Sequence, residues 1–266
     1  MKRALLGLLA LSVLTFGCTA QQASGTPTPR PQTPATSPAG DTGTPTAGES
    51  PLAAATPGES PTPGGSPVAG GTPAGPIELP ALPGKTPPRL TQKKTIKMTT
   101  DAGDLLIEVY PEAAPNAVAR FLELVEKGFY DDTPVFRVVK NPQPFVAQFG
   151  INWRGDFPTW QEKNFKDDPS LFKLERGTLA FAKGGPDTNS TQVFINYTDN
   201  SKLASPEYNF TTFGKVVEGM DIADSWKAVG DPSMGLDQGQ LWSDGEKYLK
   251  SVPEKPNMIV KMEIVD

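Results

Sequence analysis

The chain has 266 residues, 25 of them basic and 30 acidic, with a net charge of −5 and a pI near 5.0. This acidic balance disfavours a phosphate-backbone partner, which needs a basic face, so we expect no nucleic acid ligand. The chain has no histidine and one cysteine. It therefore lacks the usual general base near neutral pH and the commonest metal ligand, and it cannot form an internal disulfide. We expect neither a metal nor another cofactor.

Residues 1–18 read MKRALLGLLALSVLTFGC. Lys2 and Arg3 precede an apolar run, 4–16, that is shorter than the roughly 20 residues needed to span a bilayer. The segment ends at Cys18 and resembles a bacterial lipoprotein signal, in which this cysteine becomes the lipidated N-terminus. The resemblance implies an exported protein of the cell envelope, anchored to the membrane by lipid at Cys18. The alternative is an ordinary signal peptide with an incidental cysteine.

Residues 19–90 are rich in proline, glycine, threonine, serine and alanine, and they contain no aromatic residue. Such a segment buries too little apolar surface to offset the entropy cost of ordering it. We therefore predict a disordered tether with polyproline II character, followed by one folded domain at 91–266.

The folded domain is expected to consist mainly of strands. KTIKMTT and DLLIEVY are strand-like runs joined by DAG, which is a hairpin signal. PNAVARFLELVEKG has apolar residues at helical spacing, with Pro115 at its start and Gly128 at its end. Further strands are predicted at 133–139, 144–149, 178–183, 191–196, 211–217 and 257–265. A second, short helix is predicted at 219–229, and long loops are predicted at 150–177 and 229–256.

This pattern favours an all-β fold with minor α content. Seven or eight strands and two helices suggest a closed antiparallel barrel of eight strands, capped by the helices at its ends.

Arg137 and Gln148 are polar residues inside the apolar stretch VFRVVKNPQPFVAQFG. By period-two reasoning, Arg137 shares a strand face with Val135 and Val139. Phe145 and Gln148 are three residues apart, so only a bulge or a strong twist could place both on one face, and the nearby prolines make such an irregularity plausible. One interpretation is a functional arginine. The other is a structural arginine paired with a carboxylate at the rim of the barrel.

Four blocks of the sequence carry a resemblance to the cyclophilin family of peptidyl-prolyl isomerases. They are GFYDDTPVFRVV, PFVAQFG, GTLAFAKGGPDTNSTQVFIN and NFTTFGKVVEGMD, in the order that the family has them. The resemblance covers the chain from about residue 94 to its end and implies the cyclophilin-like barrel.

The resemblance also implies the roles of individual residues. Arg137, Phe145 and Gln148 match catalytic positions. Positions that hold the peptide are matched by Val146, Ala182, Lys183, Gln192, Phe194, Leu203 and Phe210. The chain departs from the family at Lys183, where asparagine is more usual, at Phe210, where histidine is frequent, and at Lys202, where many eukaryotic members have tryptophan. The spacing from Arg137 to Phe145 is also longer than usual.

These resemblances together predict a membrane-tethered, monomeric peptidyl-prolyl cis-trans isomerase that assists the folding of exported proteins. Its partners would be unfolded or nascent polypeptides that contain proline. Two alternatives stay open at this point. One is a non-catalytic holdase or scaffold of the same fold that binds proline-containing segments, and the other is a solute-binding lipoprotein, which would need two lobes and a hinge.

Overall fold

The computed structural model describes residues 79–266. All of these residues belong to one unit, Pro67–Asp266. The predicted signal segment with Cys18 and residues 19–78 of the predicted tether lie outside the described residues. Within 79–266, no helix has both the length and the apolar character that crossing a membrane requires.

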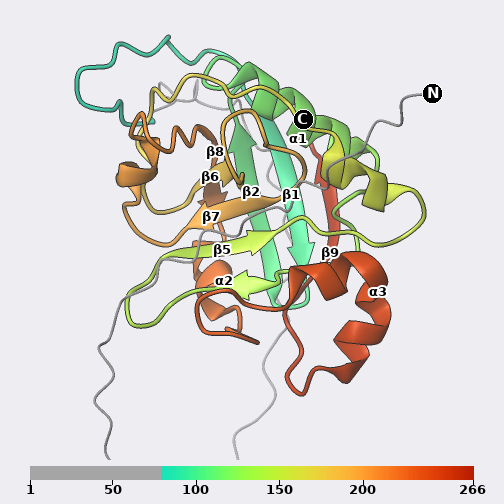
Figure 1. Cartoon of the computed structure of the whole chain (residues 1–266). Helices are drawn as coiled ribbons and strands as arrows, with labels where there is room; N and C mark the ends of the chain where they lie inside the picture. The colour runs from blue at the N-terminus through green and yellow to red at the C-terminus, as the bar shows by residue number, and fades with distance from the viewer. Residues whose placement is uncertain (1–78) are drawn as a thin grey trace, which may run out of the picture. The chain divides into compact units, whose positions relative to one another are not determined.

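One antiparallel sheet forms the body of the domain (Figure 1). Its strands are β1 (Lys94–Thr100), β2 (Gly103–Val109), β3 (Thr133–Pro134), β4 (Arg137–Val138), β5 (Val146–Phe149), β6 (Thr178–Phe181), β7 (Val193–Asn196), β8 (Thr212–Glu218) and β9 (Met258–Ile264). Their order across the sheet is β3-β9-β1-β2-β8-β6-β7-β5-β4. The strands alternate as expected for a sheet with one buried face, since Ile96 and Met98 of β1 and Ile107 of β2 are fully buried.

The two edge strands of this order, β3 and β4, are pieces of a single interrupted strand. The backbone N–H of Val135 donates to the carbonyl of Asn257 over 2.9 Å, and that of Phe136 donates to the carbonyl of Gln148 over 3.1 Å. β3 pairs with β9 and β4 pairs with β5. The interrupted strand therefore joins both edges of the sheet and closes it. Counted this way, the structure confirms the predicted closed barrel of eight antiparallel strands.

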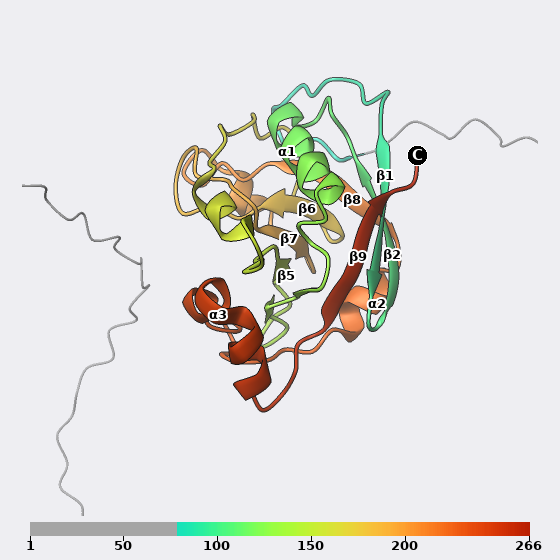
Figure 2. The same ribbon diagram turned by 90° about the vertical axis from the view of Figure 1, so that its right-hand side faces the viewer.

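Helices α1 (Pro115–Glu126) and α2 (Met220–Ser225) cover opposite ends of the barrel (Figures 1 and 2). Helix α1 buries Val118, Phe121 and Val125 at the helical spacing that the sequence predicts, and the chain leaves it at Gly128 with φ of +66°. Two short 3₁₀ helices, η1 (Phe157–Glu162) and η2 (Ser201–Ala204), lie in the connections.

The expectation of a loop over 229–256 is wrong, because Gln238–Ser251 forms a third helix, α3. The helical pattern is weak in the sequence because Leu241 and Gly245 are its only buried members. The helix also contains non-helical backbone at Asp244. It packs on the other long connection, where a Cβ at Gly245 would lie 2.2 Å from the ring of Trp153. A glycine is therefore required for this close approach.

The folded unit also begins earlier than the predicted boundary at residue 91. Leu79 and Leu90 are each 7% exposed and pack with Tyr110, Ala113 and Phe172. The backbone N–H of Lys173 donates to the carbonyl of Pro80 over 2.8 Å. Residues 79–90 therefore pack on the barrel and do not belong to the tether. The proline-rich composition of this segment gave no sign that its leucines would pack on the barrel.

Candidate active site

A pocket of about 190 Å³ opens where β4, β5, β6 and β7 approach η2. Nine of the ten site residues expected from the sequence line it: Arg137, Phe145, Val146, Gln148, Ala182, Lys183, Phe194, Leu203 and Phe210. The tenth, Gln192, is not among these lining residues, but its side chain accepts a hydrogen bond from Gln148, which is. Pockets for drug-sized ligands span about 300–1,000 Å³, so this hollow suits one small ring or side chain.

A β-bulge places Phe145 and Gln148 on the same side of the strand. The N–H of Val139 donates to the carbonyl of Val146, and the N–H of Phe145 donates to the carbonyl of Val139, both over 2.9 Å. Phe145 and Val146 thus lie together opposite the single residue Val139, which is the pattern of a bulge. The irregularity that the sequence requires is confirmed.

The walls of the pocket are apolar. Val146 and Phe194 are buried together with Leu174, Ala180 and Ala204, and the partly buried members of the same cluster include Phe145, Leu203 and Phe210. The rings of Phe194 and Phe210 meet edge to face, with their centroids 5.7 Å apart. Phe210, where the family often has histidine, therefore serves as one more aromatic wall.

Arg137 enters this apolar pocket from β4. Its Nε donates to the carbonyl of Ser233 over 2.7 Å, its Nη1 donates to Oε1 of Gln148 over 3.1 Å, and its guanidinium lies 5.8 Å from the ring centroid of Phe145. Burial lowers the pKa of Arg137 from its ordinary value. A guanidinium with so high an ordinary pKa stays charged at physiological pH.

No carboxylate in the described part of the chain forms an ion pair with Arg137. The interpretation of a structural arginine paired at the barrel rim is therefore wrong for residues 79–266. Its two protein partners are neutral and use Nε and Nη1, so the charge of Arg137 is not cancelled locally. The remaining Nη2 amino group can donate to a bound group in the pocket.

Three glutamine side chains form a chain of hydrogen bonds that begins at Arg137. Nε2 of Gln148 donates to Oε1 of Gln192 over 2.7 Å, and Nε2 of Gln192 donates to Oε1 of Gln238 over 3.0 Å. Sequence reasoning missed Ser233 and Gln238. Both lie in the segment expected as a loop, about a hundred positions from Arg137, and no motif marks them.

The ammonium of Lys183 does not point into solvent. It forms an ion pair with Asp167, donates to the carbonyl of Asn209 over 3.0 Å and lies 5.5 Å from the ring centroid of Phe210. The side chains of Lys183 and Asp167 are only 3% and 13% exposed. The charge of this lysine is therefore neutralised below the pocket.

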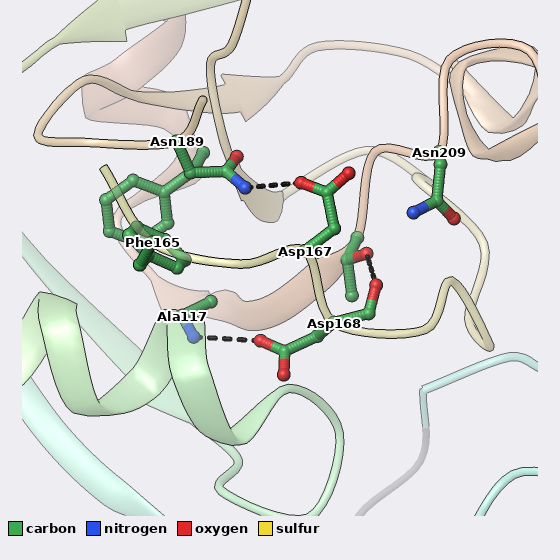
Figure 3. Close-up of a pocket in the computed structure, with 8 residues that line it drawn as sticks. Ala117, Phe165, Asp167, Asp168, Asn189 and Asn209 are labelled. Atoms are coloured by element: carbon green, nitrogen blue, oxygen red, sulfur yellow. Dashed lines mark hydrogen bonds between the residues drawn. The ribbon is translucent and has the colours of Figure 1, made fainter. Parts of the chain in front are cut away.

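Figure 3 shows the small polar hollow around Asp167, where Nδ2 of Asn189 donates to Oδ1 of Asp167 over 2.6 Å. The neighbouring Asp168 accepts hydrogen bonds from the backbone N–H groups of Asn116 and Ala117 in the first turn of α1. The hollow has a volume of only about 10 Å³, room for about one water molecule. It is a structural junction that joins loop 150–177 to α1 and to the pocket.

A wider hollow of about 620 Å³ adjoins the pocket and shares Phe145 and Leu203 with it. Lys202 lies at this hollow, together with Gln143 and Pro144 from the connection that is longer than usual in the resembled family. The departures at Lys202 and in this connection therefore lie at the surface beside the pocket, and Lys202 is not among the residues that line the pocket itself.

Comparisons with known proteins match most of this domain to one family. Residues 95–261 match the family described as cyclophilin-type peptidyl-prolyl cis-trans isomerase/CLD. A peptidyl-prolyl cis-trans isomerase of Acinetobacter baylyi is 30% identical over 172 residues, which cover 64% of this chain and 84% of that protein. A peptidyl-prolyl cis-trans isomerase-like 2 protein of Neurospora crassa is 39% identical over 139 residues, or 50% of this chain.

The aligned part spans 22% of the Neurospora crassa protein and 24% of the isomerase-like 2 protein of Gibberella zeae, so it corresponds to one part of each. Among solved structures, a cyclophilin-type isomerase of Cryptosporidium parvum superposes with a TM-score of 0.50 at 23% identity, covering 66% of this chain and 99% of that one. This likeness concerns the fold.

Proposed function

The chain belongs to the cyclophilin-type peptidyl-prolyl cis-trans isomerase family, and from that premise we propose that it accelerates the cis–trans isomerisation of Xaa-Pro bonds in unfolded or nascent exported polypeptides. One observation carries the proposal. Arg137, with no carboxylate partner in the described part of the chain, stands at an apolar pocket whose size suits a single ring.

The proposed mechanism uses the chemistry of the amide bond. An Xaa-Pro amide rotates across a barrier of about 18–20 kcal/mol and isomerises over tens to hundreds of seconds. Rotation removes the conjugation of the amide, and the nitrogen gains a lone pair. A fixed donor near that nitrogen then binds the twisted amide more strongly than the planar one, which lowers the barrier.

The residues of the pocket have separate roles in this mechanism. The apolar walls, Phe145 and Phe194 among them, hold the proline ring away from water, and Arg137 supplies the donor. One well-placed donor in a dry site contributes about 3–4 kcal/mol, or roughly 10²–10³ in rate. The protein needs no proton transfer for this step, which suits a chain without histidine.

We further propose that the protein acts as a monomer at the membrane surface, anchored by lipid at Cys18. The composition of residues 1–18 supports this location. A non-catalytic holdase is the rival function, and the departures from the family pattern at Lys202 and Phe210 motivate it. The solute-binding alternative has no support, because residues 79–266 form one unit and not two lobes.

The decisive experiment measures NMR exchange and calorimetric affinity on one Xaa-Pro peptide with the full chain. Arg137→Ala should lower kcat/KM by roughly 10²–10³ yet weaken binding of the peptide only several-fold. Arg137→Lys should restore only part of the rate, because an ammonium lacks the planar fork. Arg176→Ala is the control, since that arginine pairs with Asp224 and does not line the pocket.

Phe145→Ala and Phe194→Ala should weaken binding first, because each removes about 1.5–3 kcal/mol of apolar contact. Binding of the peptide by the wild type without faster exchange would establish the holdase instead. Equal losses of binding and rate in Arg137→Ala would mean that the arginine only docks the peptide.

A further inference from the structure

The three glutamines behind Arg137 form a chain that has only one workable direction. A guanidinium donates and never accepts, so Gln148 must turn its oxygen toward Arg137. The amino group of Gln148 then needs an acceptor, which is Oε1 of Gln192. The amino group of Gln192 in turn needs an acceptor, which is Oε1 of Gln238. The chain therefore requires an acceptor at its far end, and Oε1 of Gln238 supplies it.

Gln238 is the first residue of helix α3, and the backbone around it is fixed. The side chain of Asp237 caps the helix by accepting from the N–H of Gln240 over 2.8 Å. The N–H of Leu236 donates to the carbonyl of Phe136, the residue before Arg137, over 2.8 Å. A Cβ at Gly235 would lie 2.3 Å from that same carbonyl. The backbone of this segment therefore lies directly against the backbone of β4, with no room for a side chain at position 235.

The same segment touches Arg137 directly. The carbonyl of Ser233 accepts from Nε of Arg137 over 2.7 Å. Oδ1 of Asp231 accepts from the N–H groups of Ser233 and Met234, each over 2.8 Å, and so holds this turn in shape. One continuous segment, 231–238, thus reaches the guanidinium by two routes: at Nε through a carbonyl and at Nη1 through the glutamines.

We propose that Gln238 is a positioning residue for Arg137, and that it acts as the terminal acceptor of the Gln148–Gln192–Gln238 chain while Ser233 holds Nε. This inference rests on the proposed function, since it assigns how the donor of the isomerase is aimed. If Gln238 stops accepting, Gln192 is free to rotate its amide, and Gln148 can then present its amino group to Arg137. Two donors would face each other, and the guanidinium would turn away from the pocket.

Three substitutions test the direction of the chain. Gln238→Glu keeps the acceptor at the same place and should hold kcat/KM within about two-fold of the wild type. Gln238→Lys puts a donor there and should lower kcat/KM by about 3- to 10-fold, the effect of one hydrogen bond, with the loss mainly in kcat. Gln240→Lys is the matched control, because it adds the same charge to the same turn at an exposed position outside the chain.

A second measurement does not depend on activity. The Nε–H signal of Arg137, assigned by its loss in Arg137→Lys, reports the bond to Ser233 by its exchange with water. We expect slow exchange in the wild type, Gln238→Glu and Gln240→Lys, and faster exchange in Gln238→Lys. A merely structural role of Gln238 would not separate the glutamate variant from the lysine variant.

The outcomes are distinct. Wild-type rate and slow Nε–H exchange in Gln238→Lys would overturn the positioning role while the isomerase function stands. A wild type that does not accelerate peptide exchange would overturn the proposed function, and the Nε–H signal would still decide whether Gln238 orients Arg137. Equal losses in Gln238→Lys and Gln240→Lys would assign the effect to charge and also refute the proposal.

Discussion

The ammonium of Lys183 and the carboxylate of Asp167 form an ion pair beneath the candidate active site, with side chains that are 3% and 13% exposed. Asp167 belongs to the connection 150–177, so the pair ties this connection to the strand end that forms one wall of the pocket. Nδ2 of Asn189 completes the site by donating to the same carboxylate (Figure 3). Lys183 therefore acts here as a structural cation, at a position where the resembled family more often has asparagine.

Lys183→Met should lower the free energy of unfolding by about 3–5 kcal/mol, because it leaves the Asp167 carboxylate buried without its partner. The double variant Lys183→Met with Asp167→Leu should recover part of this loss, since an apolar pair can replace a buried ion pair at little net cost. Urea denaturation of the full chain measures both. A single-variant loss below about 1 kcal/mol would mean that the pair is open to water.

Asp168→Asn should reveal a pH dependence of stability. Burial raises the pKa of the Asp168 carboxyl, although the N–H groups of Ala117 and Asn116 act in the opposite direction. The folded state therefore binds this proton more tightly than the unfolded chain, whose pKa is about 3.9. The resulting stabilisation is present below the unfolded pKa and is lost as the pH rises through the folded pKa.

The free energy of unfolding of the wild type, relative to Asp168→Asn, should thus fall as the pH rises from about 4 toward neutrality. Urea titrations of both proteins at intervals across this range provide the measurement. A difference that grows with pH would show that the two backbone hydrogen bonds outweigh burial at this carboxylate.

Isomerisation should be nearly independent of pH between about 6 and 9. Burial lowers the pKa of Arg137, but the guanidinium starts from so high a value that it stays protonated across this range. The chain has no histidine that could titrate there. Exchange rates on one Xaa-Pro peptide at several pH values test this. A change of the isomerisation rate near pH 6.5 would mean that a titrating group other than Arg137 takes part in catalysis.

Two deletions should separate the tether from the folded unit. Removing 19–78 should leave the melting temperature almost unchanged, as the composition of that segment predicts. Removing 19–90 should lower the melting temperature by at least about 5 °C. Burial of the Leu79 and Leu90 side chains together stabilises the fold by about 3 kcal/mol or more, and the deletion removes both. Calorimetry compares the two. Equal melting temperatures would mean that the docked segment 79–90 contributes no stability.

Gly245→Ala should loosen helix α3 from the barrel. Alanine favours a helix over glycine by about 0.5–1 kcal/mol, but its Cβ would lie 2.2 Å from the ring of Trp153, and overpacking costs about 1–3 kcal/mol. Gly239→Ala is the control, since a Cβ there meets only Oδ1 of Asp237, at 3.3 Å. Hydrogen exchange of the α3 amides should quicken in the first variant alone. Unchanged protection would mean that Trp153 moves aside.

The barrel and most of the residues that line the pocket could be predicted from the amino-acid sequence. Alternation along the strands and helical spacing in 115–128 depend on local periodicity, which burial on one face imposes. The resemblance to the cyclophilin family identified nine residues from distant elements that line the pocket. Even the bulge at Phe145 followed from a spacing that no flat strand could satisfy.

The groups that surround Arg137 could not be predicted in this way, because they come from distant parts of the fold. Ser233 and Gln238 act through a carbonyl and an amide, groups that nearly any loop offers, so no residue type marks them in advance. Helix α3 packs through contacts with distant residues, such as the close approach of Gly245 to Trp153. The docking of Leu79 likewise depends on a distant partner, Phe172. Local sequence carries periodicity and motifs, whereas contacts between distant segments exist only once the chain has folded.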